Sequence, residues 1–475
     1  MEDSLNYFQK PALKVDKIVY DDQEEMVLLK NSDREMSMSV SGNAKACVDL
    51  LENLRIPDSL AWQNIDAEGN EGVVQLVNQL QQYGWIEEAS DTWQKQLHED
   101  NSCLEKWFRD AVQWLKLIDD ELDEAQKDRF NNNKKKMIMA LKTGEWGNVG
   151  GQFSSVPERL LSIVSRHWRD NKPSVAKHLL MLLEGGDQSD VLSPCHSTLA
   201  VRNRIWSALQ LLVISVNTST EETAWVEDSI IAPENSGINF LTFAEVESEK
   251  RLAEYGGGEL FEWIKGEGQR DKSAVLIHLH QSIISKFYPH VVLEFAGLDV
   301  RDDLRDLAIQ YFQEEVGHEK HELDVLKDLG VGEDQLAQFS PLPFFSVYCD
   351  VLSCLTIENP LTFLLCISIA EGLPGSKKKI AGLLKDLGLQ SSHLETHTEI
   401  DVELDHGQFT RRFFSKLPWV DSAQGTDAIR NYLFMLRYSQ LCWPQMVSYG
   451  RIFGDQWVPK AFTLSPADLL QIKSW

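Results

Sequence analysis

LRDLAIQYFQEEVGHEKHEL, residues 304–323, is the stretch that decides the fold of this chain. Its apolar residues recur with the period of an amphipathic helix and predict one buried stripe: Leu304, Leu307, Ala308, Tyr311 and Phe312. The same period brings Glu315 and His318 to that face, where both can point at one metal ion. Bundle proteins use this Glu-x-x-His spacing to hold iron or manganese through oxygen and nitrogen donors. The other charged residues of the stretch indicate a solvated charge run: Glu314, Glu319, Lys320 and Glu322.

Two stretches farther along carry the same residue types. Glu371 follows a nearly continuous apolar helix, where an unpaired carboxylate is costly, so it either reaches solvent at the helix end or bridges a cation. His397 and Asp401 lie one turn apart on one helical face, which Asp405 or His406 can continue. Carboxylates and imidazoles from three helices can hold two ions and leave positions open for oxygen and substrate. The predicted ligands are Glu315, His318, Glu371, His397, Asp401 and His406.

With these motifs, residues 250–450 are similar to the haem-oxygenase-like di-iron oxidases. That family carries a Glu on its first core helix, a Glu-Glu-x-x-His stretch on the second, a lone Glu farther along, and a His-x-x-x-Asp-x-x-His helix. Residues 314–318 match the second element, Glu371 the third, and His397 with Asp401 the start of the last. The resemblance implies a haem-oxygenase-like helical bundle that binds two Fe(II) ions and uses O2 as co-substrate. It also implies a small amino-acid-like, fatty-acid or peptide substrate in natural-product metabolism.

The chain departs from the family pattern at two ligands. The last family histidine corresponds to Leu404, so Asp405 or His406 must take its place, for example through a π-bulge. Where the family has its first-helix Glu, this chain has His278-Leu279-His280-Gln281, so His280 is the candidate ligand and Glu294 the nearest alternative carboxylate. If neither binds, one iron site is incomplete, and the enzyme is mononuclear, completes the site with substrate, or uses another metal.

The first 90 residues have a different pattern. Short β-type runs separated by turn residues cover 17–20, 26–29 and 36–40, and helical periods follow over 47–54 and 72–83 before Gly84-Trp85-Ile86. This order resembles the PqqD-like winged-helix module of peptide-modifying pathways. We therefore expect a winged-helix domain over residues 1–90, with a strand edge to which a leader peptide or carrier segment could add.

From residue 91 onward the chain has the pattern of one helix after another, so the protein is predicted to be mainly α. We expect a helical middle region over residues 91–250 and the metal-binding bundle over residues 251–475. The middle region could serve as scaffold, gate the substrate, or pair two chains in a homodimer. Two apolar stretches, 209–216 and 361–370, are too short to span a bilayer and predict buried core helices.

The composition excludes several classes of protein. The chain has 475 residues, of which 73 are acidic and 46 basic, and a formal net charge of −27. Such a charge repels phosphate backbones and anionic lipids, so we expect no nucleic-acid partner and no membrane association. The start of the sequence has no secretory signal pattern, which favours a cytoplasmic protein. The seven cysteines include no Cys-x-x-Cys pair and are expected to be reduced.

These features predict an O2-dependent non-haem iron oxidoreductase, and two alternatives remain open. A metal-free thiaminase-like hydrolase or lyase on the same bundle would need a nucleophile such as Cys366 or Cys349. A ligand-sensing regulatory protein would read DNA with the winged helix, but residues 43–54 contain only one basic side chain, Lys45. Nucleotide-binding loops and serine-hydrolase elbows are absent from the sequence.

Overall fold

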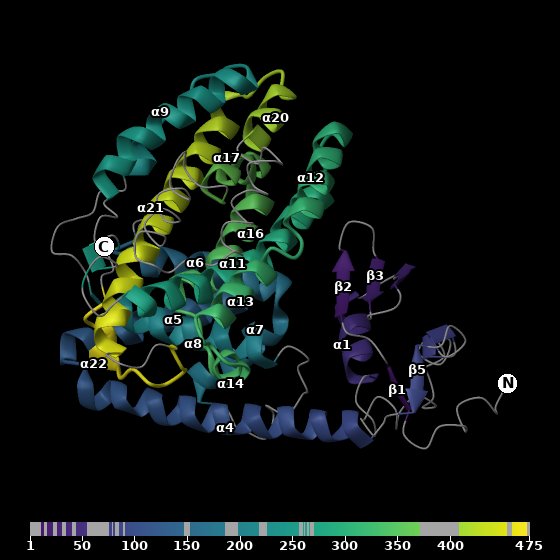
Figure 1. The fold of residues 1–475 in the computed structure, drawn as a ribbon, viewed down its shortest axis with the longest axis vertical. Helices are drawn as coiled ribbons and strands as arrows, with labels where there is room; N and C mark the ends of the chain where they lie inside the picture. Colours follow the sequence, from purple (N-terminus) through teal and green to yellow (C-terminus); the bar gives the residue numbers. More distant parts are fainter. Residues whose placement is uncertain are drawn as a thin grey trace. The chain divides into compact units, whose positions relative to one another are not determined.

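The computed structural model is mainly helical, as the sequence predicts (Figure 1). It forms two compact units, one of residues 1–110 with 185–202 and the other of residues 111–184 with 203–475. The residues that the structure describes are 11–13, 17–21, 26–30, 35–39, 44–54, 76–77, 79–80, 85–88, 91–146, 153–185, 198–217, 226–255, 260, 262–263, 266, 270–370, 408–453 and 458–472.

The first unit contains short strands at the positions expected from the β-type runs. Strands β2 (Lys17–Asp21), β3 (Met26–Lys30) and β4 (Glu35–Ser39) form an antiparallel sheet in the order β2-β3-β4, and β1 (Pro11–Leu13) pairs with β5 (Ile86–Glu88). Val27 and Leu29 point to the same face of β3 because side chains alternate along a strand. They are buried in a small core together with residues of helix α1 (Ala44–Leu54) and with Trp85.

The second unit is built from helices. Helices α4 (Asp91–Glu121) and α8 (Thr198–Ile214) contribute residues to both units. The other elements are α5 (Glu124–Thr143), α6 (Val156–Asn171), α7 (Pro173–Glu184), η3 (Val226–Ser229), α9 (Gly237–Tyr255), α11 (Arg270–Gly297), α12 (Asp302–Glu315), α13 (Glu319–Asp328), α14 (Glu333–Gln338), α15 (Pro343–Ser346), α16 (Tyr348–Glu358), α17 (Pro360–Ala370), α20 (Phe409–Ser415), α21 (Ser422–Phe453) and α22 (Pro466–Leu469).

The two apolar stretches form core helices, which confirms their prediction. Residues 209–214 belong to α8 and are buried, and α17 is buried from Thr362 to Ile367. A helix that is apolar on every side is stable only when other elements cover it, and α17 packs against α16, α20 and α21. Over the described residues, no helix combines the length and the apolar character that crossing a membrane requires.

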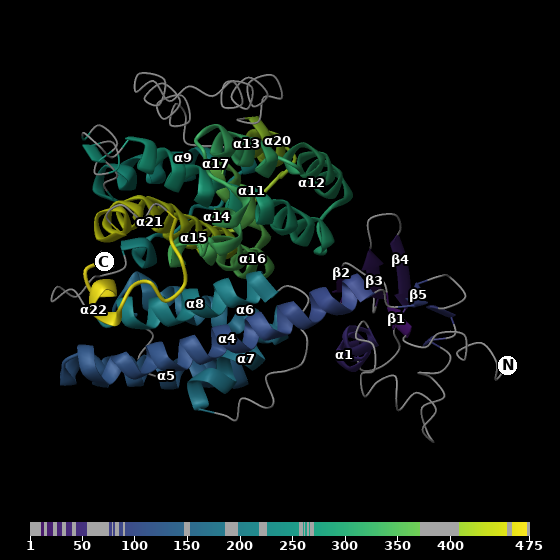
Figure 2. The same ribbon diagram turned by 60° about the horizontal axis from the view of Figure 1, so that its bottom comes forward.

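Helices from both sides of residue 250 pack together in the second unit. Figure 2 shows α5, α6, α7 and α8 as a layer against the helices of the C-terminal third. Trp168 on α6 donates a hydrogen bond to Asp350 on α16 at 2.7 Å, and Trp114 on α4 donates one to the Leu464 carbonyl at 2.8 Å. Residues 111–184 and 203–250 of the expected middle region thus lie in one compact unit with residues 251–475, which were expected to carry the metal site.

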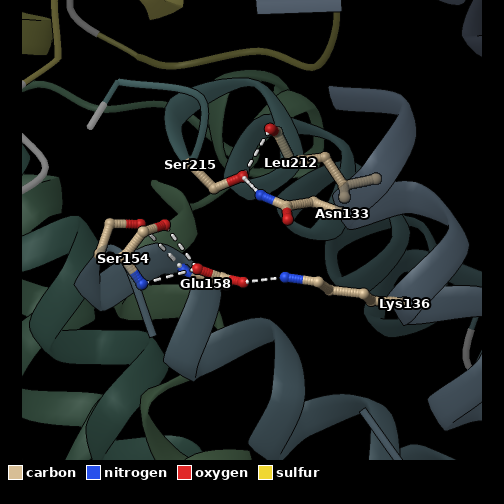
Figure 3. A network of polar contacts seen from close by, with 7 residues as sticks. Asn133, Lys136, Ser154, Glu158, Leu212 and Ser215 are labelled. Carbon is tan, nitrogen blue, oxygen red and sulfur yellow. Dashed lines mark hydrogen bonds and ion pairs between the residues drawn. The ribbon is translucent and has the colours of Figure 1, made fainter. Parts of the chain in front are cut away.

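Polar contacts hold the helices of this layer together (Figure 3). Lys136 on α5 donates to the Glu158 carboxylate on α6 at 2.7 Å, and the Ser154 amide and hydroxyl donate to its other oxygen. Burial raises the pKa of Glu158, but these hydrogen bonds outweigh it and keep the pKa below its ordinary value. Asn133 on α5 donates to the Ser215 hydroxyl at 2.9 Å, which ties α5 to the end of α8.

Candidate functional site

The predicted metal motif lies at a corner between two helices and not within one helix. Helix α12 ends at Glu315, Val316 has an extended backbone, and α13 begins at Glu319. Gly317 has a φ of +96°, in the left-handed region that glycine adopts without steric cost. The prediction of a single helix through His318 is therefore wrong, because the chain turns at Val316 and Gly317.

The turn nevertheless brings Glu315 and His318 together, as their spacing predicts. Glu315 Oε2 lies 3.4 Å from His318 Nδ1, and both residues are 8% exposed. The buried face of α12 is the predicted stripe, except that Phe312 is only half-buried. A carboxylate and an imidazole thus face each other where either would be costly alone.

Aromatic side chains pack next to this pair along α12. The hydroxyl of Tyr311, one turn before Glu315, donates to the hydroxyl of Tyr288 on α11 at 3.2 Å. The Tyr311 ring lies 4.7 Å from that of Phe409 on α20, and the Tyr288 ring lies 6.4 Å from that of Phe363 on α17. Buried rings exclude water, and electrostatic interactions become stronger in the resulting low dielectric.

The structure adds a second buried pair that the sequence interpretation missed. His278 Nδ1 on α11 lies 2.5 Å from Glu322 Oε2 on α13, with His278 4% and Glu322 7% exposed. The prediction that Glu322 belongs to a solvated charge run is wrong, although Lys320 is exposed as expected. Glu322 lies four residues after His318 and four before the buried Leu326. Continuing the helical period of the buried stripe from His318 into α13 would therefore have predicted that Glu322 is buried.

His280, the predicted first-helix ligand, forms hydrogen bonds with the protein main chain through both ring nitrogens. Its Nδ1–H donates to the Leu276 carbonyl at 2.6 Å, and its Nε2 accepts from the Leu342 amide at 3.0 Å. The ring packs between Phe339 and Phe345. This arrangement leaves neither nitrogen of His280 for a metal ion, because one carries the proton and the lone pair of the other is taken.

The remaining predicted ligands stay predictions. Glu371, His397, Asp401, Asp405 and His406 lie outside the described residues. The alternative carboxylate Glu294 is half-buried on α11. Within the part of the chain that the structure describes, no three His, Cys, Asp or Glu side chains are placed to hold one metal ion. Glu315–His318 and His278–Glu322 each join one carboxylate and one imidazole.

A buried charged network lies elsewhere in the second unit. Arg204 Nε on α8 donates to Asp350 Oδ2 at 2.6 Å, and its Nη2 donates to Oδ1 at 3.0 Å. Burial raises the pKa of the Asp350 carboxyl, but the Arg204 guanidinium and the Lys172 ammonium hold it well below its usual range. Burial also raises the pKa of the Cys349 and Cys366 thiols, so both remain protonated near neutral pH.

His280 should make the fold sensitive to acid. Burial lowers its pKa to about 4, whereas the ordinary value is 6.5, so the unfolded chain binds more protons between these pH values. The free energy of unfolding should therefore fall as the pH drops from 6.5 towards 4, by about 3 kcal/mol for this residue. His280→Gln keeps an acceptor for Leu342 but cannot titrate. The free energy of unfolding, measured with urea at pH 7.5 and at pH 4.5, should differ less between the two pH values in His280→Gln than in the parent chain. An equal difference in both proteins would contradict this role of His280.

Gly317 should matter for the geometry of the pair. In Gly317→Ala, the new methyl group would meet only the end of Lys320, at 4.0 Å, so the cost is backbone strain and not a clash. The expected loss is about 1 kcal/mol of stability, and the iron binding predicted from the sequence should weaken because His318 shifts relative to Glu315. Gly330→Ala is the matched control, since Gly330 has a φ of +83° and open space but lies after α13. Equal iron affinity of both variants, measured by titration, would argue against the turn as a positioning device.

Comparison with known proteins adds no family to this description. No protein-family model matches the chain, and no curated protein and no solved structure is similar to it at a significant level. The function of the site is therefore inferred from its side chains, their burial and their contacts.

Proposed function

We propose that this protein is an O2-dependent non-haem iron oxidoreductase in which Glu315 and His318 bind iron. The observation that carries the proposal is the 3.4 Å approach of Glu315 Oε2 to His318 Nδ1 at a buried helix corner. Glu315 is the last residue of α12 and His318 the residue before α13, and the turn at Gly317 lies between them.

The donor set fits a redox-active divalent ion. A carboxylate oxygen and an imidazole nitrogen are ligands that Fe(II) and Mn(II) accept, whereas structural zinc sites favour thiolates. The other ligands in this proposal are Glu371, His397 and Asp401 together with His406 or Asp405, which would complete a site for two ions.

The protein side chains have three tasks in such a site. Bound Fe(II) would supply the electrons that activate O2. Glu315 and His318 would hold the ion at the corner between α12 and α13. Tyr311 and the aromatic rings packed on it keep water away from a reactive oxidant. The apolar face of α17, which includes Leu364 and Leu365, extends the water-poor core.

The proposal includes the domain identities that the sequence suggests. Residues 251–475 would form a haem-oxygenase-like bundle, and residues 1–90 a PqqD-like winged-helix module. The described sheet has the order β2-β3-β4, and β4 pairs with β3 alone among the described strands. A leader peptide or carrier segment could add to such an edge through main-chain hydrogen bonds. The substrate would then be amino-acid-like or peptidic.

The cysteine-based alternative is less well supported. A nucleophilic cysteine acts as its thiolate, and the pKa of Cys349 and Cys366 is raised by burial. Both thiols are therefore poor nucleophiles near neutral pH. A metal-free hydrolase or lyase on this bundle would need an activated thiol at another position.

Iron stoichiometry tests the proposal most directly. The full chain is loaded with ferrous ion without oxygen, desalted, and assayed for iron per chain, then mixed rapidly with O2 while optical spectra and oxygen uptake are recorded. We expect about two tightly bound ions per chain, as carboxylate-bridged bundle proteins hold, and a transient visible band. No tightly bound iron and no oxygen uptake would overturn the proposal.

A further inference from the structure

Helices α12 and α13 follow one another along α11, although the chain turns between them. The side chain of Arg305 on α12 donates to the Ala296 carbonyl near the end of α11 at 3.1 Å. Beyond the turn, Leu326 on α13 packs in one core cluster with Val275 near the start of α11. The contacts thus move from one end of α11 to the other, and both helices pack against it. Together, α12 and α13 form the second arm of an antiparallel helical hairpin.

The side of this arm that points away from α11 carries one row of exposed residues. Their spacing alternates between four and three positions, as on one side of a helix that packs in a coiled coil. All of them are exposed, whereas Leu304, Leu307 and Tyr311 on the opposite side of α12 are buried. The row consists of Asp302, Asp306, Ile309, Gln313, Val316, Lys320, Leu323 and Lys327.

The chemistry of the row changes from one end to the other. It begins with the carboxylates of Asp302 and Asp306 and ends with the ammonium groups of Lys320 and Lys327. Large apolar side chains recur along it at intervals of seven residues. Single exposed apolar residues are common on protein surfaces, but a row at heptad spacing is typical of a seam between two helices. These apolar residues are Ile309, Val316 and Leu323, which are 40%, 54% and 38% exposed.

Such a row is complementary to a second copy of itself in the antiparallel orientation. A two-fold axis at Val316 places Ile309 of one copy opposite Leu323 of the other, because each lies seven residues from the axis. Asp306, ten residues before the axis, then lies next to Lys327, eleven residues after it. Each of these contacts occurs twice, and Val316 meets its own copy. Opposite charges therefore meet on both sides of an apolar centre.

We propose that two copies of this chain pair through the exposed row of α12 and α13 in an antiparallel, two-fold symmetric contact. Charge complementarity selects a second copy as the occupant, since the acidic end of the row matches its own basic end. Among the described residues of the same chain, Asp306 and Lys327 have no ion-pair partner. The contact requires no metal ion, so it can hold or fail independently of the proposed function.

Sedimentation equilibrium of the full, metal-free chain measures this contact. We expect reversible association at micromolar concentrations, towards twice the chain mass of 54.1 kDa. Ile309→Glu should weaken the association about 100-fold, because it places a charge against the apolar Leu323 at two positions. Val246→Glu on α9 is the matched control, since Val246 is 44% exposed, and it should associate as the parent chain does. A parent chain that keeps a mass of 54.1 kDa up to high micromolar concentrations would overturn the proposal.

The two charged ends of the row test the orientation of the copies. Asp306→Lys and Lys327→Glu each bring like charges together at both ends, so each variant alone should associate about 10-fold more weakly than the parent chain. Mixed together, the two variants should form a heterodimer with an affinity near that of the parent, because every altered residue then meets an opposite charge. A mixture that associates no more tightly than either variant alone would overturn the antiparallel contact.

Lys135→Glu on α5 is the control for net charge. It also replaces an exposed lysine with a glutamate, but outside the row, and it should associate as the parent chain does. Circular-dichroism spectra of all these variants should match the parent spectrum, because each replaced side chain is exposed. Weakening by Lys135→Glu equal to that by Lys327→Glu would show that overall repulsion, and not the pairing of Asp306 with Lys327, decides the association.

Discussion

His318→Ala should abolish the proposed tight iron binding and the proposed metal-dependent oxygen uptake, while the helical circular-dichroism signal stays largely intact. The variant removes one of two donors that meet at 3.4 Å, and alanine cannot replace a nitrogen ligand. Loss of a residue that merely orients a ligand costs about 10- to 100-fold in metal affinity, so loss of the ligand should cost at least about 100-fold. Glu371→Ala should have the same effect, since Glu371 is predicted to bind the same metal centre.

The measurements for these variants are iron per chain and oxygen uptake after anaerobic loading. His290→Ala is the matched control, because His290 is exposed on α11, and it should behave as the parent chain. Oxygen uptake by His318→Ala and Glu371→Ala at the parent rate would contradict the proposed set of metal ligands. Loss of the circular-dichroism signal would instead indicate unfolding, in which case Glu315→Gln, which keeps the shape of the side chain, decides the question.

Asp350→Ala should destabilise the fold by about 3–5 kcal/mol, the range found when one partner of a buried ion pair is removed. Asp350 accepts hydrogen bonds from Arg204 and Trp168, and its loss leaves the guanidinium buried without its carboxylate. The free energy of unfolding, from urea denaturation at pH 7.5, measures the effect. Asp303→Ala is the control, since the exposed pair of Asp303 and Arg301 should contribute about 1 kcal/mol or less.

The same pair should make the protein sensitive to strong acid. Because the pKa of Asp350 is lowered in the folded state, its stabilisation is complete above its unfolded pKa of about 4 and decreases as the pH falls below that value. The Asp350→Asn variant should lose this acid dependence. A double variant, Arg204→Met with Asp350→Leu, should be more stable than Asp350→Ala, because no buried charge is left unpaired. A destabilisation of Asp350→Ala similar to that of Asp303→Ala would contradict the role of the pair.

The sequence by itself determined the features that depend on local periodicity. The 3.6-residue spacing of apolar side chains predicts the buried face of α12, and the two apolar stretches predict the core helices α8 and α17. Spacing also predicts that Glu315 and His318 lie close together, although they meet across the turn at Val316 and Gly317 and not along one helix. These predictions succeed because the secondary structure and the buried face of a helix depend mainly on residues that are close in the sequence.

Only the tertiary structure decided which distant side chains meet. His278 reaches Glu322 across 44 residues, and Arg204 reaches Asp350 across 146, through helix crossings that no local period encodes. For the same reason the sequence could not separate His278 from His280, two positions along the same helix. The Leu342 amide, 62 residues away, occupies one nitrogen of His280, whereas His278 faces a carboxylate. Burial and hydrogen bonding of a polar side chain depend on what packs against it, and that is fixed only when the helices assemble.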